Sequence, residues 1–271
     1  MSTQKTLRRK IAAHVRAKSR AKLRRKTTRR KPPVGVIWWG YSPIDGARLV
    51  AISTYARSEE EANGKTGLMA QIYIIRADMS PSDAIRTGCD VSCCGYCAAR
   101  GRDGFEERGC YVNMSKGPRM VWEKYSAGGY RRIRPEAFRG FDVRWGAYGD
   151  PGMLPESLVR AVNAVSSGWT GYTHQHKQPF AQWCKGVFMA SADTQAQEIS
   201  LAADGWGVFR AMQRDGADQG DATICQNAVD DTKCKTCKAC NGDAVRIVVP
   251  AHGPGAKWLP VERKRRLALA S

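Results

Sequence analysis

The residues best suited to chemistry are four cysteines near the C-terminal end of the chain. Cys225, Cys234, Cys237 and Cys240 follow the spacing C-x8-C-x2-C-x2-C. Three thiols so close in sequence can converge on one point, and the fourth is near enough to complete a tetrahedral set. The pattern predicts a metal centre. We favour an iron–sulfur cluster of the 4Fe-4S type and keep zinc as the alternative, because zinc sites usually pair two separated C-x2-C clasps.

A second cysteine group occurs earlier in the chain. Cys94 and Cys97 form a C-x2-C clasp, and Cys89 and Cys110 lie on either side of it. We expect Cys94 and Cys97 to bind a metal together with either Cys89 or Cys110, with Tyr96 shielding the cluster from water. The alternative is a set of buried free thiols that pack as small hydrophobic side chains.

The elements that must position these cysteines alternate between strands and helices. We expect strands over Val34–Tyr41, Arg48–Tyr55, Leu68–Arg76, Val143–Tyr148, Trp169–His174, Val187–Ala192, Trp206–Met212, Ala222–Ile224 and Val245–Pro250. Helices are expected to begin at Pro81 after the N-cap Ser80, to run from Pro155 to Ser167 with Gly168 as C-cap, and to run from Thr194 to Asp204. This order predicts an α/β fold with a largely parallel sheet, as a partial or complete (β/α) barrel or, second, as an open doubly wound sheet.

Polar residues follow several of the expected strands at their carboxyl ends. Gly149 and Asp150 follow one strand, and His174, Asp193 and His252 follow three others. Ligands bind at these ends in parallel α/β folds, so we expect Asp150, His174, Asp193 and His252 to be catalytic. Gly149 would let the backbone approach a cofactor, and Asp150 would hydrogen-bond it. The alternatives are a simple turn at Gly149–Asp150 and an N-cap role for Asp193.

Positive charge is concentrated at the start of the chain. The formal net charge is +19, and residues 1–33 hold fourteen Lys or Arg and no acidic residue. We expect three parts: a disordered basic arm (1–33), a metal-binding α/β domain (34–253) and a basic tail (254–271). The arm predicts nucleic-acid binding through phosphate contacts, with a solubilising tail and a targeting peptide as alternatives. The candidate nucleic-acid residues are Arg24, Arg25, Lys26, Arg29 and Arg30 in the arm and Arg131 and Arg132 in the domain.

The composition also bears on the cellular compartment. No apolar run approaches the length of a membrane span, and no apolar signal segment stands at the N-terminus. The cysteines cluster in C-x2-C units, apart from Cys184, which we expect to be a thiol of the hydrophobic core. These features favour metal ligation in a reducing, cytoplasmic compartment over a secreted disulfide protein, and they predict no membrane partner.

Two resemblances extend this reading. Cys94-Gly95-Tyr96-Cys97 resembles the end of the C-x3-C-x2-C signature of radical S-adenosylmethionine enzymes, although four residues separate Cys89 from Cys94. The segment Gly149-Asp150-Pro151 is similar to the Gly-Gly-Glu-Pro strand that binds the methionine amine there, and the C-terminal cysteines look like an auxiliary-cluster module. The resemblance implies two iron–sulfur clusters, S-adenosylmethionine bound by Asp150, and radical chemistry supplied by the cofactor.

The chain more closely resembles uncharacterised, Cys-rich phage and plasmid proteins over residues 34–253. The shared pieces are the Cys-Gly-x-Cys clasp, Cys110–Asn113, Gly146–Pro151, Gly171–Gln175, Met189–Asp193 and the last cysteine group through Gly253. This resemblance implies one architecture and the cytoplasm of a host cell, and it carries no activity.

Three functions therefore compete. The first is an iron–sulfur protein, as a radical-S-adenosylmethionine-like enzyme. The second is a nucleic-acid-binding protein with structural metals. The third is a rolling-circle nicking enzyme, because His174 and His176 place two imidazoles on one face of a strand.

Overall fold

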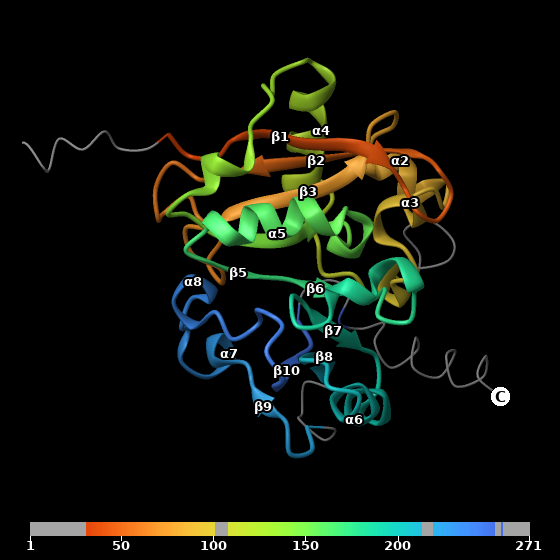
Figure 1. Ribbon diagram of the computed structural model, residues 1–271, viewed down its shortest axis with the longest axis vertical. Coiled ribbons are helices and arrows are strands. Elements are labelled where there is room, and N and C mark those ends of the chain that lie inside the picture. The colour runs from red at the N-terminus through yellow and green to blue at the C-terminus, as the bar shows by residue number, and fades with distance from the viewer. Residues whose placement is uncertain (1–30, 101–107, 213–218, 253–255, 257–271) are drawn as a thin grey trace, which may run out of the picture. The chain divides into compact units, whose positions relative to one another are not determined.

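The computed structural model describes residues 31–100, 108–212, 219–252 and 256 (Figure 1). The chain divides into two units, residues 1–31 and 32–271, and of the first unit only Lys31 is among the described residues. The arm residues Arg24, Arg25, Lys26, Arg29 and Arg30 lie outside the described residues, as does most of the predicted tail.

The first sheet is mixed and contains five strands in the order β1-β2-β3-β4-β5. Its members are β1 (Gly35–Tyr41), β2 (Arg48–Thr54), β3 (Ala70–Arg76), β4 (Asp142–Tyr148) and β5 (Gly168–Thr170). The pairs β1–β2 and β2–β3 are antiparallel, whereas β3–β4 and β4–β5 are parallel. Strand β2 is buried at five successive positions because apolar side chains fill both faces of the middle of the sheet.

The second sheet is parallel throughout and contains five strands in the order β6-β7-β8-β10-β9. Its members are β6 (Tyr172–Thr173), β7 (Met189–Ala192), β8 (Val208–Met212), β9 (Thr223–Ile224) and β10 (Arg246–Pro250). Glu198 is fully buried and accepts from Arg210 at 2.6 Å and from Arg246 at 2.9 Å. A buried carboxylate needs such partners, so this ion pair fixes α6 on β8 and β10.

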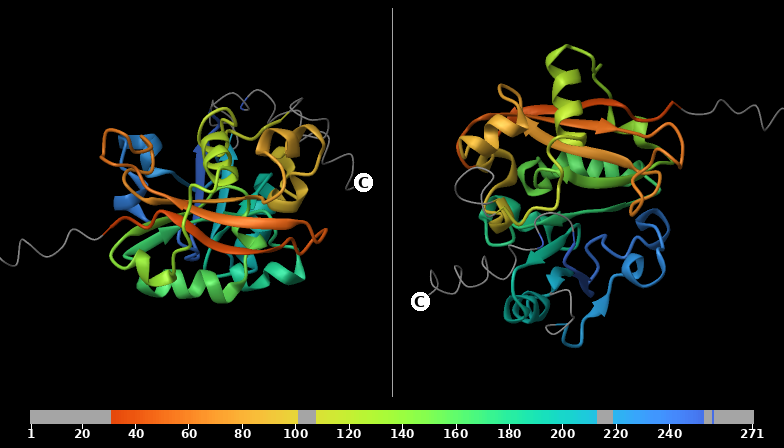
Figure 2. Two further views of the ribbon diagram at one scale, coloured as in Figure 1. Left: turned by 90° about the horizontal axis from the view of Figure 1, so that it is seen from above. Right: turned by 180° about the vertical axis from the view of Figure 1, so that it is seen from behind.

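Helices cover the sheets on both sides. They are α2 (Pro81–Arg86), α3 (Val91–Cys94), α4 (Gly117–Ser126), α5 (Glu156–Val165), α6 (Gln195–Ala203), α7 (Gln226–Asp230) and α8 (Cys234–Cys237), with short 3₁₀ turns η1 (Ala98–Arg100), η2 (Pro135–Phe138), η3 (Pro151–Met153) and η4 (Pro179–Cys184). Figure 2 shows α5 on one face of the first sheet, with α3 and α4 on the other. The middle of this sheet is therefore shielded from water on both faces.

One large hydrophobic core joins the two sheets. Trp145 on β4 and Phe188 before β7 are fully buried and meet edge to face, with ring centroids 6.1 Å apart. The Trp145 indole donates to Asn163 Oδ1 on α5 at 2.9 Å, so its one polar atom is satisfied. Cys184 is also fully buried, as expected for a core thiol.

The α/β fold is confirmed, and the predicted barrel is not. Sequence periodicity predicts one strand over Trp169–His174, but the chain forms β5 and β6 in separate sheets with Gly171 between them. A Cβ at Gly171 would lie 2.5 Å from the Phe188 ring, so the chain passes the core there without a side chain. Gly168 begins β5, whereas α5 ends at its C-cap Ser166, so the predicted cap at Gly168 is wrong.

The predicted cap of α2 is confirmed, because the Ser80 side chain accepts from the Asp83 backbone N–H and Pro81 opens the helix. Among the helices that the structure describes, none combines the length and apolar character needed to cross a membrane.

Candidate metal centre

The four C-terminal cysteines line a single cavity of about 120 Å³. Cys225 follows β9, Cys234 and Cys237 are the first and last residues of α8, and Cys240 lies on the way to β10. The remaining lining residues carry no acidic group: Thr170, Tyr172, Thr223, Ile224, Gln226, Asn227, Thr232, Lys238, Ala239 and Ile247. Sulfur is thus the dominant ligand type that the cavity offers, and soft thiolate ligands select zinc, copper(I) or iron–sulfur centres.

Backbone geometry turns the cysteine loop back on itself. Lys238 adopts a left-handed conformation with φ 54°, and its N–H donates to the Cys234 carbonyl at 2.9 Å. The loop is anchored from a distant part of the chain, because the Cys234 N–H donates to the Lys65 carbonyl at 3.0 Å. The Lys238 ammonium pairs with Asp142 at 2.7 Å. The cysteines therefore sit on a loop held at several points.

Burial and nearby donors act on these thiols in opposite directions. Burial raises the pKa of Cys240 to about 12, although the Tyr172 hydroxyl, which hydrogen-bonds the sulfur, and Arg144 both lower it. Burial also raises the pKa of Cys234, and Arg144 again opposes that effect. An apolar pocket favours neutral thiols, whereas a neighbouring cation favours thiolates.

Arg144 on β4 is a buried cation beside this cavity. Arg144 is only 8% exposed. Its guanidinium donates to the Tyr111 hydroxyl at 3.0 Å and lies 4.7 Å from the centroid of the Tyr172 ring. Burial alone would lower the pKa of Arg144, but Tyr111, Tyr172 and Cys234 raise it and prevail. Within the described residues, Arg144 has no carboxylate at ion-pair distance. A buried charge without a counter-charge is costly, so the position calls for an anion.

Two kinds of centre use such a donor set. In the described parts of the chain, no group of three or more His, Cys, Asp or Glu side chains is arranged to hold a metal ion. Zinc would require its four sulfurs about 2.3 Å from one point, whereas an iron–sulfur cluster separates its cysteine sulfurs by several iron and sulfide atoms. The cavity of about 120 Å³ is lined by the four cysteines together with ten other residues.

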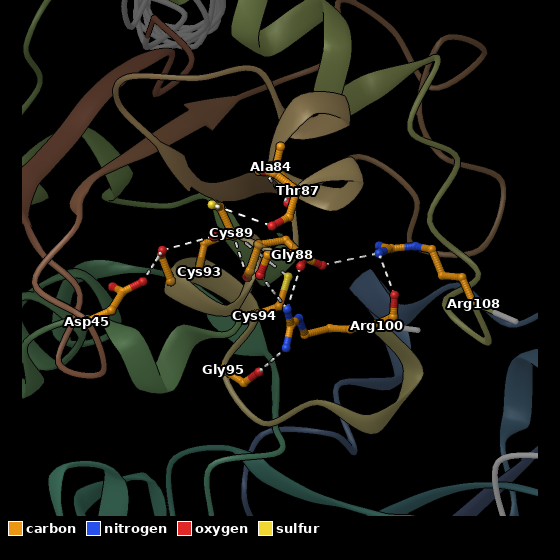
Figure 3. A network of polar contacts seen from close by, with 12 residues as sticks. Asp45, Ala84, Thr87, Gly88, Cys89, Cys93, Cys94, Gly95, Arg100 and Arg108 are labelled. Atoms are coloured by element: carbon orange, nitrogen blue, oxygen red, sulfur yellow. Dashed lines mark hydrogen bonds and ion pairs between the residues drawn. The ribbon is translucent and has the colours of Figure 1, made fainter. Parts of the chain in front are cut away.

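The N-terminal cysteine group is ordered by a buried carboxylate. Asp90 is 2% exposed and pairs with Arg100 at 2.6 Å and with Arg108 at 3.3 Å. Arg100 also donates to the Gly88 carbonyl at 2.9 Å, and Figure 3 shows Arg100 and Arg108 converging on the loop beside Cys94. Arg100 and Arg108, which both follow the Cys94–Cys97 clasp in the sequence, thus connect to Asp90, which precedes the clasp.

Within this group, Cys97 approaches His174. The Cys97 sulfur lies 3.8 Å from His174 Nε2, which is also 3.8 Å from Asp193 Oδ1. Burial would lower the pKa of His174, but Cys97 and then Asp193 and Asp150 raise it to about 9. The structure thus brings the candidates His174 and Asp193 to 3.8 Å from each other and adds Cys97 to them.

Cys94 and Cys110 complete the same neighbourhood. The side-chain hydrogen bond between Cys94 and Cys93, whose sulfurs lie 3.9 Å apart, and burial together raise the pKa of Cys94, and the Cys97 charge acts in the same direction. Burial raises the pKa of Cys110, which Arg108 lowers and Cys97 raises. Cys94 and Cys110 therefore both lie within electrostatic reach of Cys97.

Cys89, the other predicted alternative, has a different neighbour. Its sulfur contacts the Thr87 carbonyl at 3.8 Å, as the dashed line in Figure 3 shows. The charge of Cys97 acts on Cys110, so Cys110 shares the electrostatic environment of the clasp. The Tyr96 side chain is 58% exposed and does not provide the expected shield over the clasp.

Hydrogen bonds of Asp150 and Gln175 connect the loop at Cys94 with the segment at His174. The Asp150 carboxylate accepts from the backbone N–H of Gly152 at 2.8 Å, from that of His174 at 2.7 Å and from Gln175 Nε2 at 3.0 Å. Gln175 is fully buried and also bonds the Cys94 carbonyl and the Tyr96 N–H. Asp150 thus positions His174 and Gln175. Sequence reasoning missed Gln175, since only its place between two histidines marks it.

Two glycines are needed by this packing. Gly95, at φ +60°, faces Met153 and Gln175 so closely that an added Cβ would lie 2.3 Å and 2.4 Å from them. An added Cβ at Gly149, at φ +80°, would lie 2.3 Å from the Ile74 carbonyl oxygen. The structure therefore needs a glycine here for close packing on β3.

The remaining candidates lie elsewhere. His252 stacks on Tyr111 with ring centroids 5.7 Å apart and hydrogen-bonds the Pro250 carbonyl through Nδ1 at 2.9 Å. Arg131 and Arg132 are exposed beside β1, where Val36 bridges to Arg132. Comparison of the chain with protein-family models, with curated proteins and with solved structures found no match.

Proposed function

We propose that this protein binds an iron–sulfur cluster through Cys225, Cys234, Cys237 and Cys240. The observation that carries the proposal is the buried Arg144 cation, which has no carboxylate partner among the described residues and lies beside a cavity lined by these four thiols. Four ligating thiolates carry more negative charge than a metal core carries positive charge. A metal centre held by the four thiolates therefore has a net negative charge, and this charge would pair with the buried Arg144 cation.

Cavity size favours iron–sulfur over zinc. A single zinc ion would gather the four sulfurs around one point, whereas a cluster interposes several iron and sulfide atoms between them. The cavity of about 120 Å³, which the four cysteines line together with ten other residues, offers space for such a core.

The surrounding residues would tune such a centre. When bound, the cluster supplies one-electron redox chemistry. Tyr172 donates a hydrogen bond to the Cys240 sulfur, Arg144 adds positive charge, and Ile224 and Ile247 line the cavity with apolar surface. Hydrogen bonds and charge at the sulfurs raise a cluster's reduction potential, and burial limits solvent access.

The N-terminal group supports a second metal centre in the same proposal. Its proposed donors are Cys94 and Cys97 of the clasp, with His174, whose Nε2 lies 3.8 Å from the Cys97 sulfur, and with either Cys110 or Cys89. S-adenosylmethionine is not part of the proposal, because the Asp150 carboxylate already accepts three internal hydrogen bonds.

Metal and sulfide analysis of anaerobically purified protein tests the proposal. Wild type should be coloured, with iron and acid-labile sulfide in equal amounts, and Cys234→Ala should lose both from the C-terminal centre. Cys184→Ala is the matched control, because Cys184 is a buried free thiol outside both groups. A colourless wild-type protein with stoichiometric zinc and no sulfide would overturn the proposal and would favour structural zinc instead.

A further inference from the structure

Exposed aromatic rings mark the edge of the first sheet. Strand β1 is the outermost strand of that sheet, and on it Trp39 is 43% exposed and Tyr41 is 70% exposed. Large aromatic side chains left in water on an edge strand commonly mark an interaction surface. Tyr41 also borders a recess of about 190 Å³ lined mainly by Trp38, Phe180, Met153, Leu154 and two prolines. The Tyr41 ring therefore stands at the edge of an apolar recess.

Arginines flank these rings. The segment after α4 runs beside β1, since the Val36 N–H donates to the Arg131 carbonyl at 2.9 Å and the Ile133 N–H donates to the Val36 carbonyl at 2.9 Å. Arg131, Arg132 and Arg134 are all exposed. In the part of the chain that the structure describes, none of the three forms an ion pair. Their charges are thus available to an outside anion.

Cations and rings alternate on this surface. The Arg132 guanidinium carbon lies 5.9 Å from the centroid of Trp39, and the Lys124 ammonium lies 4.7 Å from that of Tyr130. No Asp or Glu occurs between Lys124 and Arg134. Such contacts hold a cation near each ring without neutralising it.

We propose that this surface binds single-stranded nucleic acid, with Trp39 and Tyr41 stacking on bases and Arg131, Arg132 and Arg134 contacting phosphates. Phosphate contacts alone would serve a duplex equally well. Side-chain rings reach free base faces only in an unpaired strand, because a duplex stacks its bases on one another. The fourteen basic residues of positions 1–33, which directly precede β1 in the sequence, supply the same charge complementarity. This inference is independent of the proposed metal centre.

Fluorescence anisotropy of the full chain with a labelled oligothymidine tests the inference, with a duplex of equal length as the comparison. Base stacking is worth enough that Trp39→Ala should weaken single-strand binding about 5- to 100-fold. Trp39→Phe should restore most of the affinity, and duplex binding should change little. Tyr41→Ala, at the more exposed ring, provides a second variant if Trp39→Ala fails to fold.

The salt dependence separates stacking from charge. Arg132→Gln should lower the slope of log affinity against log salt by about 0.7, whereas Trp39→Ala should leave that slope unchanged. Arg160→Gln on α5 is the control for removal of an exposed arginine elsewhere. Unchanged single-strand affinity in both Trp39→Ala and Tyr41→Ala, or equal losses for single strand and duplex, would overturn the inference.

Discussion

Replacing Arg144 by glutamine tests whether an anionic centre lies beside this buried cation. In metal-free protein, the change removes a hydrogen bond to Tyr111 and a contact with Tyr172. A charged hydrogen bond is worth about 1.5–3 kcal/mol and a cation–π contact about 0.5–2 kcal/mol. The change also relieves an uncompensated buried charge, which costs several kcal/mol. The two effects offset, so the metal-free variant should unfold at nearly the wild-type urea concentration.

In the metal-loaded protein, the same substitution should lower the free energy of unfolding. Without Arg144, the anionic centre would be left unpaired, and removing one partner of a buried pair costs about 3–5 kcal/mol. We therefore expect Arg144→Gln to destabilise the loaded form by about that amount, while Arg144→Lys retains much of the stability because it keeps the charge. The assay is urea unfolding under anaerobic conditions, before and after chelation.

Arg210→Gln is the matched control for this experiment. Arg210 is fully buried and pairs with Glu198, so its loss should destabilise the loaded and metal-free forms alike. If Arg144→Gln likewise destabilises both forms equally, Arg144 is only a structural residue and no anionic centre lies beside it.

Three further predictions concern the scaffold. Gly95→Ala should destabilise the protein by about 1–3 kcal/mol more than Gly88→Ala in urea unfolding, because both have positive φ but only Gly95 has no room for a Cβ. Asp150→Ala should cost about 2–5 kcal/mol and should shift the His174 ring resonances in NMR spectra, because three donors lose their acceptor. Burial raises the pKa of Asp45, but hydrogen bonds from Ser92 and from the backbone outweigh it and lower the pKa below 3.8. Asp45→Asn should therefore be less stable than wild type at neutral pH, and acid titration of unfolding should show the difference vanishing as the pH falls through that lowered pKa.

Local signals in the sequence were sufficient for most elements. Ser80 and Pro81 predicted the start of α2, because a hydroxyl cap and a proline both act within one turn. The alternation of strands and helices predicted the α/β class. The split between β5 and β6 could not be predicted, since it depends on Phe188, which reaches Gly171 only in the folded core.

The candidate sites were partly predictable for the same reason. Spacing identified the C-x2-C clasps, because their two thiols are necessarily close in space. Nothing in the sequence favoured Cys110 over Cys89, since the two residues flank the clasp and spacing does not encode the tertiary contacts of either. No local pattern marks Arg144 as a buried residue, because its burial beside Tyr111 and Tyr172 brings distant segments together.

X-ray absorption at the metal edge tests the central claim most directly. The sample is anaerobically purified Cys94→Ala/Cys97→Ala protein, in which the C-terminal cysteines are the remaining clustered thiols. We predict iron with sulfur neighbours and a second iron scatterer, as a polynuclear cluster requires. Zinc with four sulfurs and no neighbouring metal, or a metal bound only through nitrogen and oxygen, would contradict the claim.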